Sequence, residues 1–176
     1  MRTILLSAAG LIASAVLLSF NAGPGKTPPA SPSDQAFFMK AASGGTFEIK
    51  TAQLAMARDS GNQEVISFAK QMIADHTKLG DALKATAAAK GVTVRDTLIG
   101  DDAANYSALD AKSGADFEKS YLSMNVLGHE KSLALHKKEE QSTKDAQIKS
   151  TVKSAIPVIS HHLMMAKMLD RKYKSK

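Results

Sequence analysis

The stretch "MIADHTKLGDAL", Met72 to Leu83, decides the fold, because its apolar residues recur at the three- and four-residue spacing of one helix face. Upstream, the same stripe includes Val65, Phe68 and Ala69, and His76 lies inside it rather than beside it. An amphipathic helix of this kind is marginal alone and buries its apolar face against other helices. The sequence therefore predicts a helical bundle with an imidazole side chain pointing into its core.

Similar patterns fill the chain beyond Asp34, with little of the alternation typical of strands. They predict four long helices and one short helix, over residues 34–59, 62–90, 103–111, 115–141 and 145–172. Ser33 or Asp34, Asn62 and Asp145 are the expected N-caps, and Pro157 is expected to kink the last helix. The expected fold is all-α, an antiparallel four-helix bundle whose long crossover between the second and third long helices carries the short helix.

The N-terminal residues differ from the rest of the chain. Arg2 precedes an apolar run from Ile4 to Leu18 without any acidic residue, which is the composition of a secretory signal peptide. We expect a signal peptide over 1–22, with an uncleaved anchor as the alternative, a linker rich in Pro, Gly and Ser over 23–33, and the bundle domain over 34–176. The protein is thus expected to be exported and periplasmic or associated with the cell envelope.

Composition limits the function classes. The chain has no cysteine, which excludes disulfides, thiolate metal ligands, cysteine nucleophiles and a lipidated N-terminal cysteine. Only two basic residues precede Asp34, so the remainder holds 21 Lys and Arg against 17 Asp and Glu, a net charge of +4. The basic C-terminal residues suggest peripheral contact with anionic lipid or polysaccharide, and a solvated tail is the alternative. Nucleic-acid binding is not expected, because Trp is absent and aromatic residues are 5% of the chain.

Each expected long helix places one ligand-capable side chain on its apolar face. These residues are Glu48, His76, His129 and His162. Glu48 is the sharpest anomaly, because an unpaired buried carboxylate requires a cation, a metal or several hydrogen-bond donors. About 12 residues separate Glu48 from the first turn and about 15 separate His76 from it, an axial offset of roughly 4 Å. A similar offset relates His129 to His162, so all four can meet at one level.

This set predicts a site for one transition-metal ion, Zn, Cu, Ni or Fe. The alternative is a structural or interaction protein without metal, in which a hydrogen-bonded Glu and His cluster fixes the helix register. A metalloenzyme is a third reading, which requires an open coordination position and a pocket.

Other residues near the predicted site have competing readings. His136 and His161 are expected to be partly exposed, and either can replace an assigned ligand. The methionines around Met165 suggest a thioether copper site or simple core filling. Gly44 and Gly45 are costly inside a helix, and we expect them to permit close approach of another helix or of the ligand side chains.

Several segments resemble an exported bacterial family called domain of unknown function 4142. They are "AASGGTFEIKTAQLA" (41–55), "FAKQMIADHTK" (68–78), "GADFEKSY" (114–121) leading to His129, and "PVISHHLMMAKML" (157–169). The resemblance implies a ferritin-like bundle, an envelope location and, for some members, an outer-membrane label. It carries over Gly45, Glu48, Asp75, His76, His129, Pro157 and His162. The family has Asp before its third-helix His where this chain has Gly128, which leaves His129 without an adjacent carboxylate.

Ferritin-like chemistry does not follow from the resemblance. A di-iron carboxylate site uses Glu-x-x-His motifs on two of its helices. The residues three positions before the five histidines are all apolar, namely Ile73, Val126, Leu133, Val158 and Ile159. Neither ferroxidase activity nor a hydrolase is expected, since the nucleophile motif G-x-S-x-G is also absent. No catalytic residue is predicted.

Overall fold

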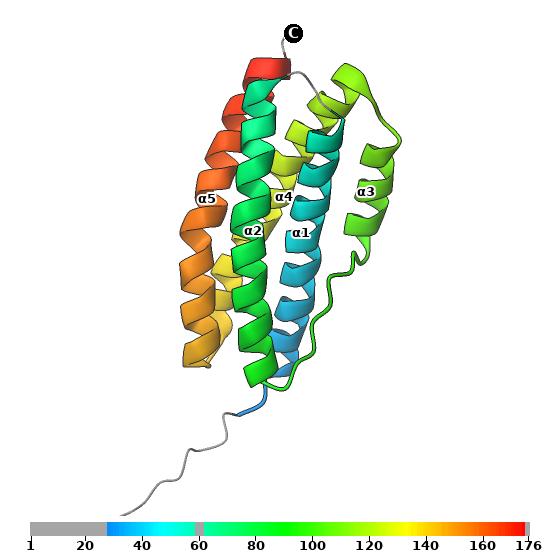
Figure 1. The fold of residues 1–176 in the computed structure, drawn as a ribbon. Coiled ribbons are helices and arrows are strands. Elements are labelled where there is room, and N and C mark those ends of the chain that lie inside the picture. Colours follow the sequence, from blue (N-terminus) through cyan, green and yellow to red (C-terminus); the bar gives the residue numbers. More distant parts are fainter. Residues whose placement is uncertain (1–27, 59–61, 175–176) are drawn as a thin grey trace, which may run out of the picture.

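The computed structural model describes residues 28–58 and 62–174, and every regular element in these two ranges is a helix (Figure 1). The expected signal peptide lies outside the described residues. The helices are α1 (Pro32–Ala57), α2 (Gln63–Ala89), α3 (Asp101–Asp110), α4 (Gly114–Ser142) and α5 (Ala146–Lys174). Their bounds confirm the expected helices to within about two residues at each end, which is the ordinary uncertainty of a helix end.

The caps explain where the helices start. Asn62 and Asp145 cap α2 and α5 as expected, each accepting hydrogen bonds from two backbone amides of the first turn. The predicted cap of the first helix was wrong, because α1 begins at Pro32 and Ser31 is its N-cap. Ser31 and Asp34 form a capping box, in which each side chain accepts from the other residue's backbone N–H. The helix thus starts inside the segment that we expected to be a linker.

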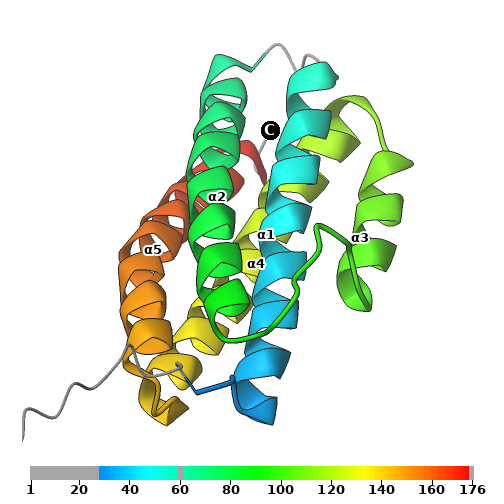
Figure 2. The ribbon, with the colours of Figure 1, turned by 60° about the horizontal axis from the view of Figure 1, so that its bottom comes forward.

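The four long helices form two hairpins, α1 with α2 and α4 with α5 (Figures 1 and 2). α1 also lies beside α4, and α2 beside α5, but the two hairpins contact each other less extensively than the helices within each hairpin. All neighbouring long helices run antiparallel (Figure 1). The connection after α2 returns along the bundle to α3, which packs on α1 and α4. This confirms the long crossover and its short helix.

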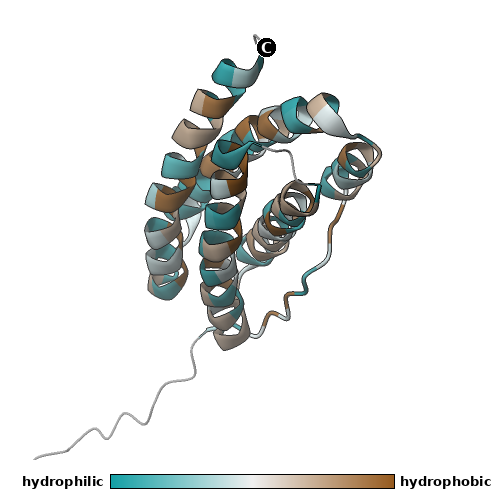
Figure 3. Cartoon of the chain, turned by 45° about the horizontal axis from the view of Figure 1, so that its top comes forward, coloured by the Kyte–Doolittle hydropathy of each residue, from teal (hydrophilic) through white to brown (hydrophobic). Residues whose placement is uncertain are grey.

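The core consists of two apolar clusters, one toward each end of the bundle. We call the first the packed half; it contains Ala52, Ala55, Val65, Phe68, Ala69, Met72, Leu109, Phe117, Tyr121, Leu122, Ala166 and Leu169. We call the second the hollow half; it contains Ala30, Phe37, Phe38, Ala42, Leu83, Ala87, Ile148 and Val152. Hydrophobic and hydrophilic residues alternate along the long helices, as expected when one face is buried (Figure 3).

Two sets of polar contacts join neighbouring elements of the bundle, one between α2 and α5 and one between α1 and the crossover. The ammonium of Lys90 at the end of α2 lies 2.6 Å from Asp145 at the start of α5, and the Lys90 side chain is only 3% exposed. Ser43 of α1 donates to Asp102 of α3 at 2.5 Å and accepts from the Ile99 backbone N–H, which fixes the crossover against α1.

α5 remains helical through Pro157, which is exposed. None of the described helices has both the length and the apolar character needed to cross a membrane.

Candidate metal centre

Three buried imidazoles converge between the two apolar clusters. His76 comes from α2, His129 from α4 and His162 from α5. The Nε2 atom of His76 lies 3.4 Å from Nε2 of His129 and 3.3 Å from Nδ1 of His162. One nitrogen from each ring lies within 4.8 Å of the other two. The structure thus brings together the three histidines that helical phase assigned to one level.

The outer hydrogen bonds of two rings determine which nitrogens face inward as lone pairs. His129 Nδ1 lies 2.8 Å from the backbone oxygen of Asn125, and His162 Nε2 lies 3.0 Å from Oδ2 of Asp75. Both oxygens are acceptors, so these ring nitrogens carry the protons and the inward nitrogens of neutral His129 and His162 carry lone pairs. His76 Nε2 can donate one proton to one of them. At least one inward lone pair is therefore left without a donor within the cluster.

Burial keeps these imidazoles neutral. Desolvation holds the pKa of His76 well below its usual value, with the neighbouring histidines acting in the same direction. Desolvation also lowers the pKa of His129 to about 4, against the opposing effect of its bond to Asn125. The pKa of His162 is lowered by burial too, although Asp75 opposes the shift. Neutral imidazole is the form that binds metals, so these rings are in the ligand state at neutral pH.

The spacing of the nitrogens fits a tetrahedral ion. With Zn–N bonds of about 2.0–2.1 Å, two tetrahedral ligands lie about 3.3 Å apart. The two measured separations from His76, 3.3 and 3.4 Å, match that distance. The inward nitrogens of His129 and His162 also lie within 4.8 Å of each other. Three nitrogens arranged in this way can hold an ion with a fourth position free for another ligand.

Asp75 of α2 orients His162 of α5 rather than its sequence neighbour His76. Adjacent residues on a helix point in different directions, so Asp75 reaches across to α5 while His76 points inward. A carboxylate that accepts from the outer nitrogen of a ligating histidine fixes the ring and raises its basicity. The sequence contained Asp75 but not this partner, because the partner depends on the packing of α2 against α5.

Glu48 lies beside the cluster, on the outer side of His129. Its Oε1 atom is 3.6 Å from His129 Nδ1, the ring nitrogen that faces away from His76, and its Oε2 atom is buried without a hydrogen-bond partner among the described residues. Desolvation, reinforced by the charge of Asp102, raises the pKa of the Glu48 carboxyl well above its usual value. In the structure, the group that converges is thus three histidines, and Glu48 is their immediate neighbour.

Gly128 explains how Glu48 reaches this place. A Cβ atom on residue 128 would lie 2.6 Å from Glu48 Oε1, closer than real Cβ contacts allow. The carboxyl group of Glu48, from α1, thus occupies the space that a side chain on residue 128 would need. The resemblance implied an Asp at position 128, and in this chain the Glu48 carboxyl group of α1 lies there instead.

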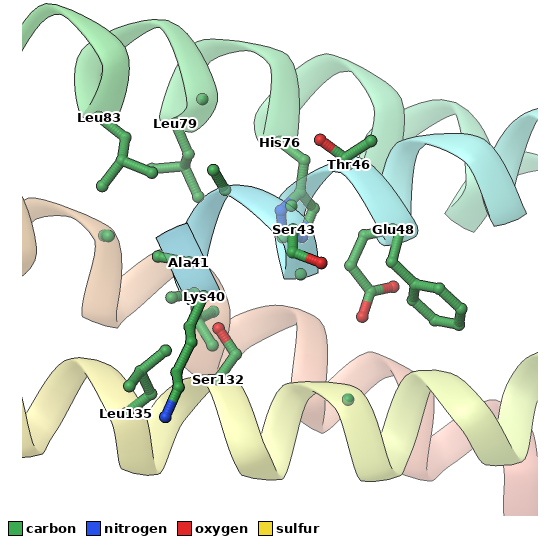
Figure 4. Close-up of a pocket in the computed structure, with 18 of the residues that line it drawn as sticks. Lys40, Ala41, Ser43, Thr46, Glu48, His76, Leu79, Leu83, Ser132 and Leu135 are labelled. Atoms are coloured by element: carbon green, nitrogen blue, oxygen red, sulfur yellow. The ribbon is translucent and has the colours of Figure 1, made fainter. Parts of the chain in front are cut away.

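A cavity of about 1280 Å³ reaches the histidine cluster from the hollow half. Its wall includes Glu48, His76 and His129 at one end, and Figure 4 shows His76, Leu79 and Leu83 pointing into it from α2. Exposed residues such as Lys40 also line it, so the cavity reaches the surface. Sequence periodicity did not reveal this space, because a helical stripe does not report how closely the facing stripes approach.

The surroundings of the neighbouring histidines, methionines and glycines test the remaining expectations. His161 is exposed, as expected, but the expectation for His136 was wrong, because it is only 7% exposed and contacts the Phe37 ring edge-on inside the bundle. Met164 and Met168 are 60% and 55% exposed, so neither fills the core. No close approach explains Gly44 and Gly45, since a Cβ at either position meets nothing within 4 Å. Both glycines line the cavity instead.

Comparison with known proteins gives one result. A family model described as "Domain of unknown function (DUF4142)" matches residues 20–169, which includes all four predicted site residues. No curated protein and no solved structure matches the chain.

Proposed function

Since the chain belongs to the DUF4142 family, which has no assigned activity, we propose from its own residues that it binds one transition-metal ion through His76, His129 and His162. We infer that its role is storage or buffering of that ion, or a part in the envelope stress response. The bundle carries the site in the manner of ferritin-like proteins, with ligands projecting inward from facing helices.

The observation that carries the proposal is the mismatch of donors and acceptors in the cluster. Three neutral imidazoles face one another, and the outer acceptors of His129 and His162 leave at most one proton, from His76, for two inward lone pairs. A purely hydrogen-bonded core cluster pairs its buried polar atoms. A metal ion satisfies all three nitrogens at once, and the two separations from His76 Nε2 already match Zn–N geometry.

Glu48 is the fourth predicted ligand, and two roles fit its position. In the first role its buried, unpartnered Oε2 is a ligand to the ion, and in the second the Glu48 carboxyl group stays 3.6 Å from the outer nitrogen of His129. In the second role the fourth coordination position belongs to a ligand from the cavity. Histidine nitrogens suit Zn, Cu, Ni and Fe, and the choice among them depends on supply and geometry.

We further propose that the protein works outside the cytoplasm. The support is the leader-like composition of residues 1–22, with a basic start, an apolar run and no acidic residue.

Metal analysis of the purified chain tests the proposal. The protein is purified without chelator or affinity tag, loaded separately with Zn, Cu, Ni and Fe, desalted and analysed by plasma mass spectrometry. We expect close to one ion per chain, lost in His76→Ala and in His129→Ala. His161→Ala is the matched control, because His161 is an exposed histidine next to the site residue His162.

Retention of no metal by a folded wild-type protein would overturn the metal proposal and favour the structural alternative. The Glu48→Gln variant separates the two roles of Glu48. Loss of the ion identifies Glu48 as a ligand, whereas a bound ion with reduced affinity identifies it as a neighbour that acts through His129.

A further inference from the structure

We propose that the cavity in the hollow half binds an elongated amphipathic molecule, whose oxygen-donor head group completes the coordination of the ion at His76 and His129 and whose apolar chain extends toward His136. Acids with a second polar head atom, such as hydroxamic or hydroxy acids, fit this description. The inference rests on the proposed metal site and adds a ligand class to it.

The space for this molecule is built into the helices. Gly44 lies in the middle of α1, on the same side as Glu48 four residues later, and a helix-interior glycine costs about 0.5–1 kcal/mol relative to alanine. Close packing does not account for it, because a Cβ there meets nothing within 4 Å. Gly80 of α2 also lines the cavity and has the same open surroundings. Glycines on two facing helices therefore keep a volume open that a bulky side chain would fill.

The walls fit an apolar chain. Leu79 and Leu83 point inward from α2, and Leu135 lines the opposite side on α4 (Figure 4). His129 and His136 both line the cavity and lie seven residues apart on α4, about 10 Å along the helix axis. The volume of about 1280 Å³ exceeds the 300–1,000 Å³ typical of small-molecule sites. An apolar chain several carbons long can extend along this wall.

The inner end of the cavity suits a polar head group. His76 and His129 line the cavity whereas His162 does not, so an ion held by the three histidines faces the cavity on the side of the first two. Beside them, Oε2 of Glu48 is buried and lacks a hydrogen-bond partner among the described residues. A head group with two adjacent polar atoms can bind the ion with one and pair with Glu48 through the other. A hydroxamate has this arrangement.

Cobalt(II) absorption provides the test, because the visible spectrum of the ion reports its ligands directly. Co(II)-loaded protein is titrated with octanohydroxamate and with acetohydroxamate, which have the same head group and differ in their chains. We expect both to change the spectrum and octanohydroxamate to bind at least tenfold more tightly, since its longer chain buries apolar surface in the cavity. Cobalt content after desalting verifies that neither compound removes the ion.

Variants of Gly44 locate the chain. Gly44→Leu is expected to fill the cavity and reduce the preference for the longer compound to less than twofold, while binding of acetohydroxamate stays unchanged. Gly44→Ala adds only a methyl group to the same helix and should retain the preference. If Gly44→Leu does not fold, Leu83→Trp narrows the cavity from α2 and should have the same effect.

The outcomes separate the two proposals. A cobalt spectrum that neither compound changes, or equal affinities for both compounds, overturns the cavity proposal and leaves the metal site standing. Failure of the folded protein to bind cobalt, together with failure to retain Zn, Cu, Ni or Fe, overturns both proposals. A chain-length preference that survives Gly44→Leu and Leu83→Trp shows that the chain lies elsewhere and also overturns the cavity proposal.

Discussion

The two halves of this bundle are built from the same helices but packed differently. In the packed half, fully buried aromatic and aliphatic residues such as Phe68, Phe117 and Leu122 fill the space between all four long helices. In the hollow half, the apolar cluster is smaller and the cavity occupies the space between the helices. The histidine cluster lies where the two halves meet. One half thus holds the rings in place while the other gives access to them.

This division explains how a buried polar cluster is tolerated. Removing polar groups from water is costly unless they are paired. Here the buried polar groups are the three histidine rings, which pack against the packed half on one side. Their outer N–H groups are partly satisfied, because His129 donates to the Asn125 carbonyl and His162 donates to Asp75. A bundle packed equally at both ends would leave the same imidazoles with no route to an ion or ligand.

The largest expected contrast is between two leucines, one in each half. Leu122→Ala in the packed half should lower the free energy of unfolding by about 3–5 kcal/mol, because Leu122 is fully buried and the cavity left behind adds to the loss. Leu83→Ala should cost about 2 kcal/mol or less, since Leu83 already borders the cavity and its truncation adds little new empty volume. Urea unfolding with equal m-values would measure both. Equal losses would contradict the division into halves.

The next contrast concerns the support of the histidines. Asp75→Ala should weaken zinc affinity about 10- to 100-fold, because His162 loses the carboxylate that accepts from its outer nitrogen. Asp81→Ala is the control, as Asp81 is an exposed carboxylate on the same helix and lines the cavity. Titration against a competing chelator at fixed pH measures both variants. Equal weakening by the two changes would mean that general negative charge, not orientation of His162, is responsible.

The outer end of the hollow half should respond to pH. Burial, together with the neighbouring Asp34, raises the pKa of Glu139 to about 7. The protonated form is favoured in the folded state, so this contribution to stability is complete below the unfolded pKa of Glu and is lost as pH rises through about 7. We expect stability to fall by about 1–2 kcal/mol more in the wild type than in Glu139→Gln between pH 5 and 8. Urea unfolding at each pH measures both proteins, and free energies of unfolding that change equally with pH in the wild type and in Glu139→Gln would refute this prediction.

The smallest expected effect compares two glycines on inward helix faces. Gly44→Ala should stabilise the protein by about 0.5–1 kcal/mol, because the methyl group enters open space and the glycine penalty is removed. Gly128→Ala should bring no such gain, since its Cβ would displace the buried Glu48 carboxylate. Thermal unfolding of the metal-free protein measures both. A gain of equal size at both positions would mean that Glu48 moves away without cost.

Much of the fold followed from local patterns. The stripe through Phe68, Met72 and His76 predicted the second long helix and its buried face, and Asn62 and Asp145 predicted two helix starts. These features depend on residues a few positions apart in the same helix, so a short stretch of sequence is enough to predict them. The start of α1 was missed by two residues because Ser31, Ser33 and Asp34 all have capping side chains, and the position of Pro32 decided among them.

The site followed in part for the same reason. Helical phase and depth placed His76, His129 and His162 on buried faces at one level, and the structure brings them together. Phase also placed Glu48 inward, but whether its carboxylate meets the inner or the outer nitrogen of His129 depends on how α1 packs against α4 at Gly128. The pairing of Asp75 with His162 likewise depends on two helices that are far apart in the sequence.

The sequence by itself determined the helices, their buried faces and the level of the histidines, because each of these depends on spacing along one helix. The tertiary structure alone decided the tautomers of His129 and His162, the burial of His136, and the cavity beside Gly44, because each depends on the separation between helices. Close packing in one half and open space in the other arise from the same kind of apolar stripe. The two halves differ in how completely the side chains of facing helices fill the space between them, and this depends on which helices pack together in the folded bundle.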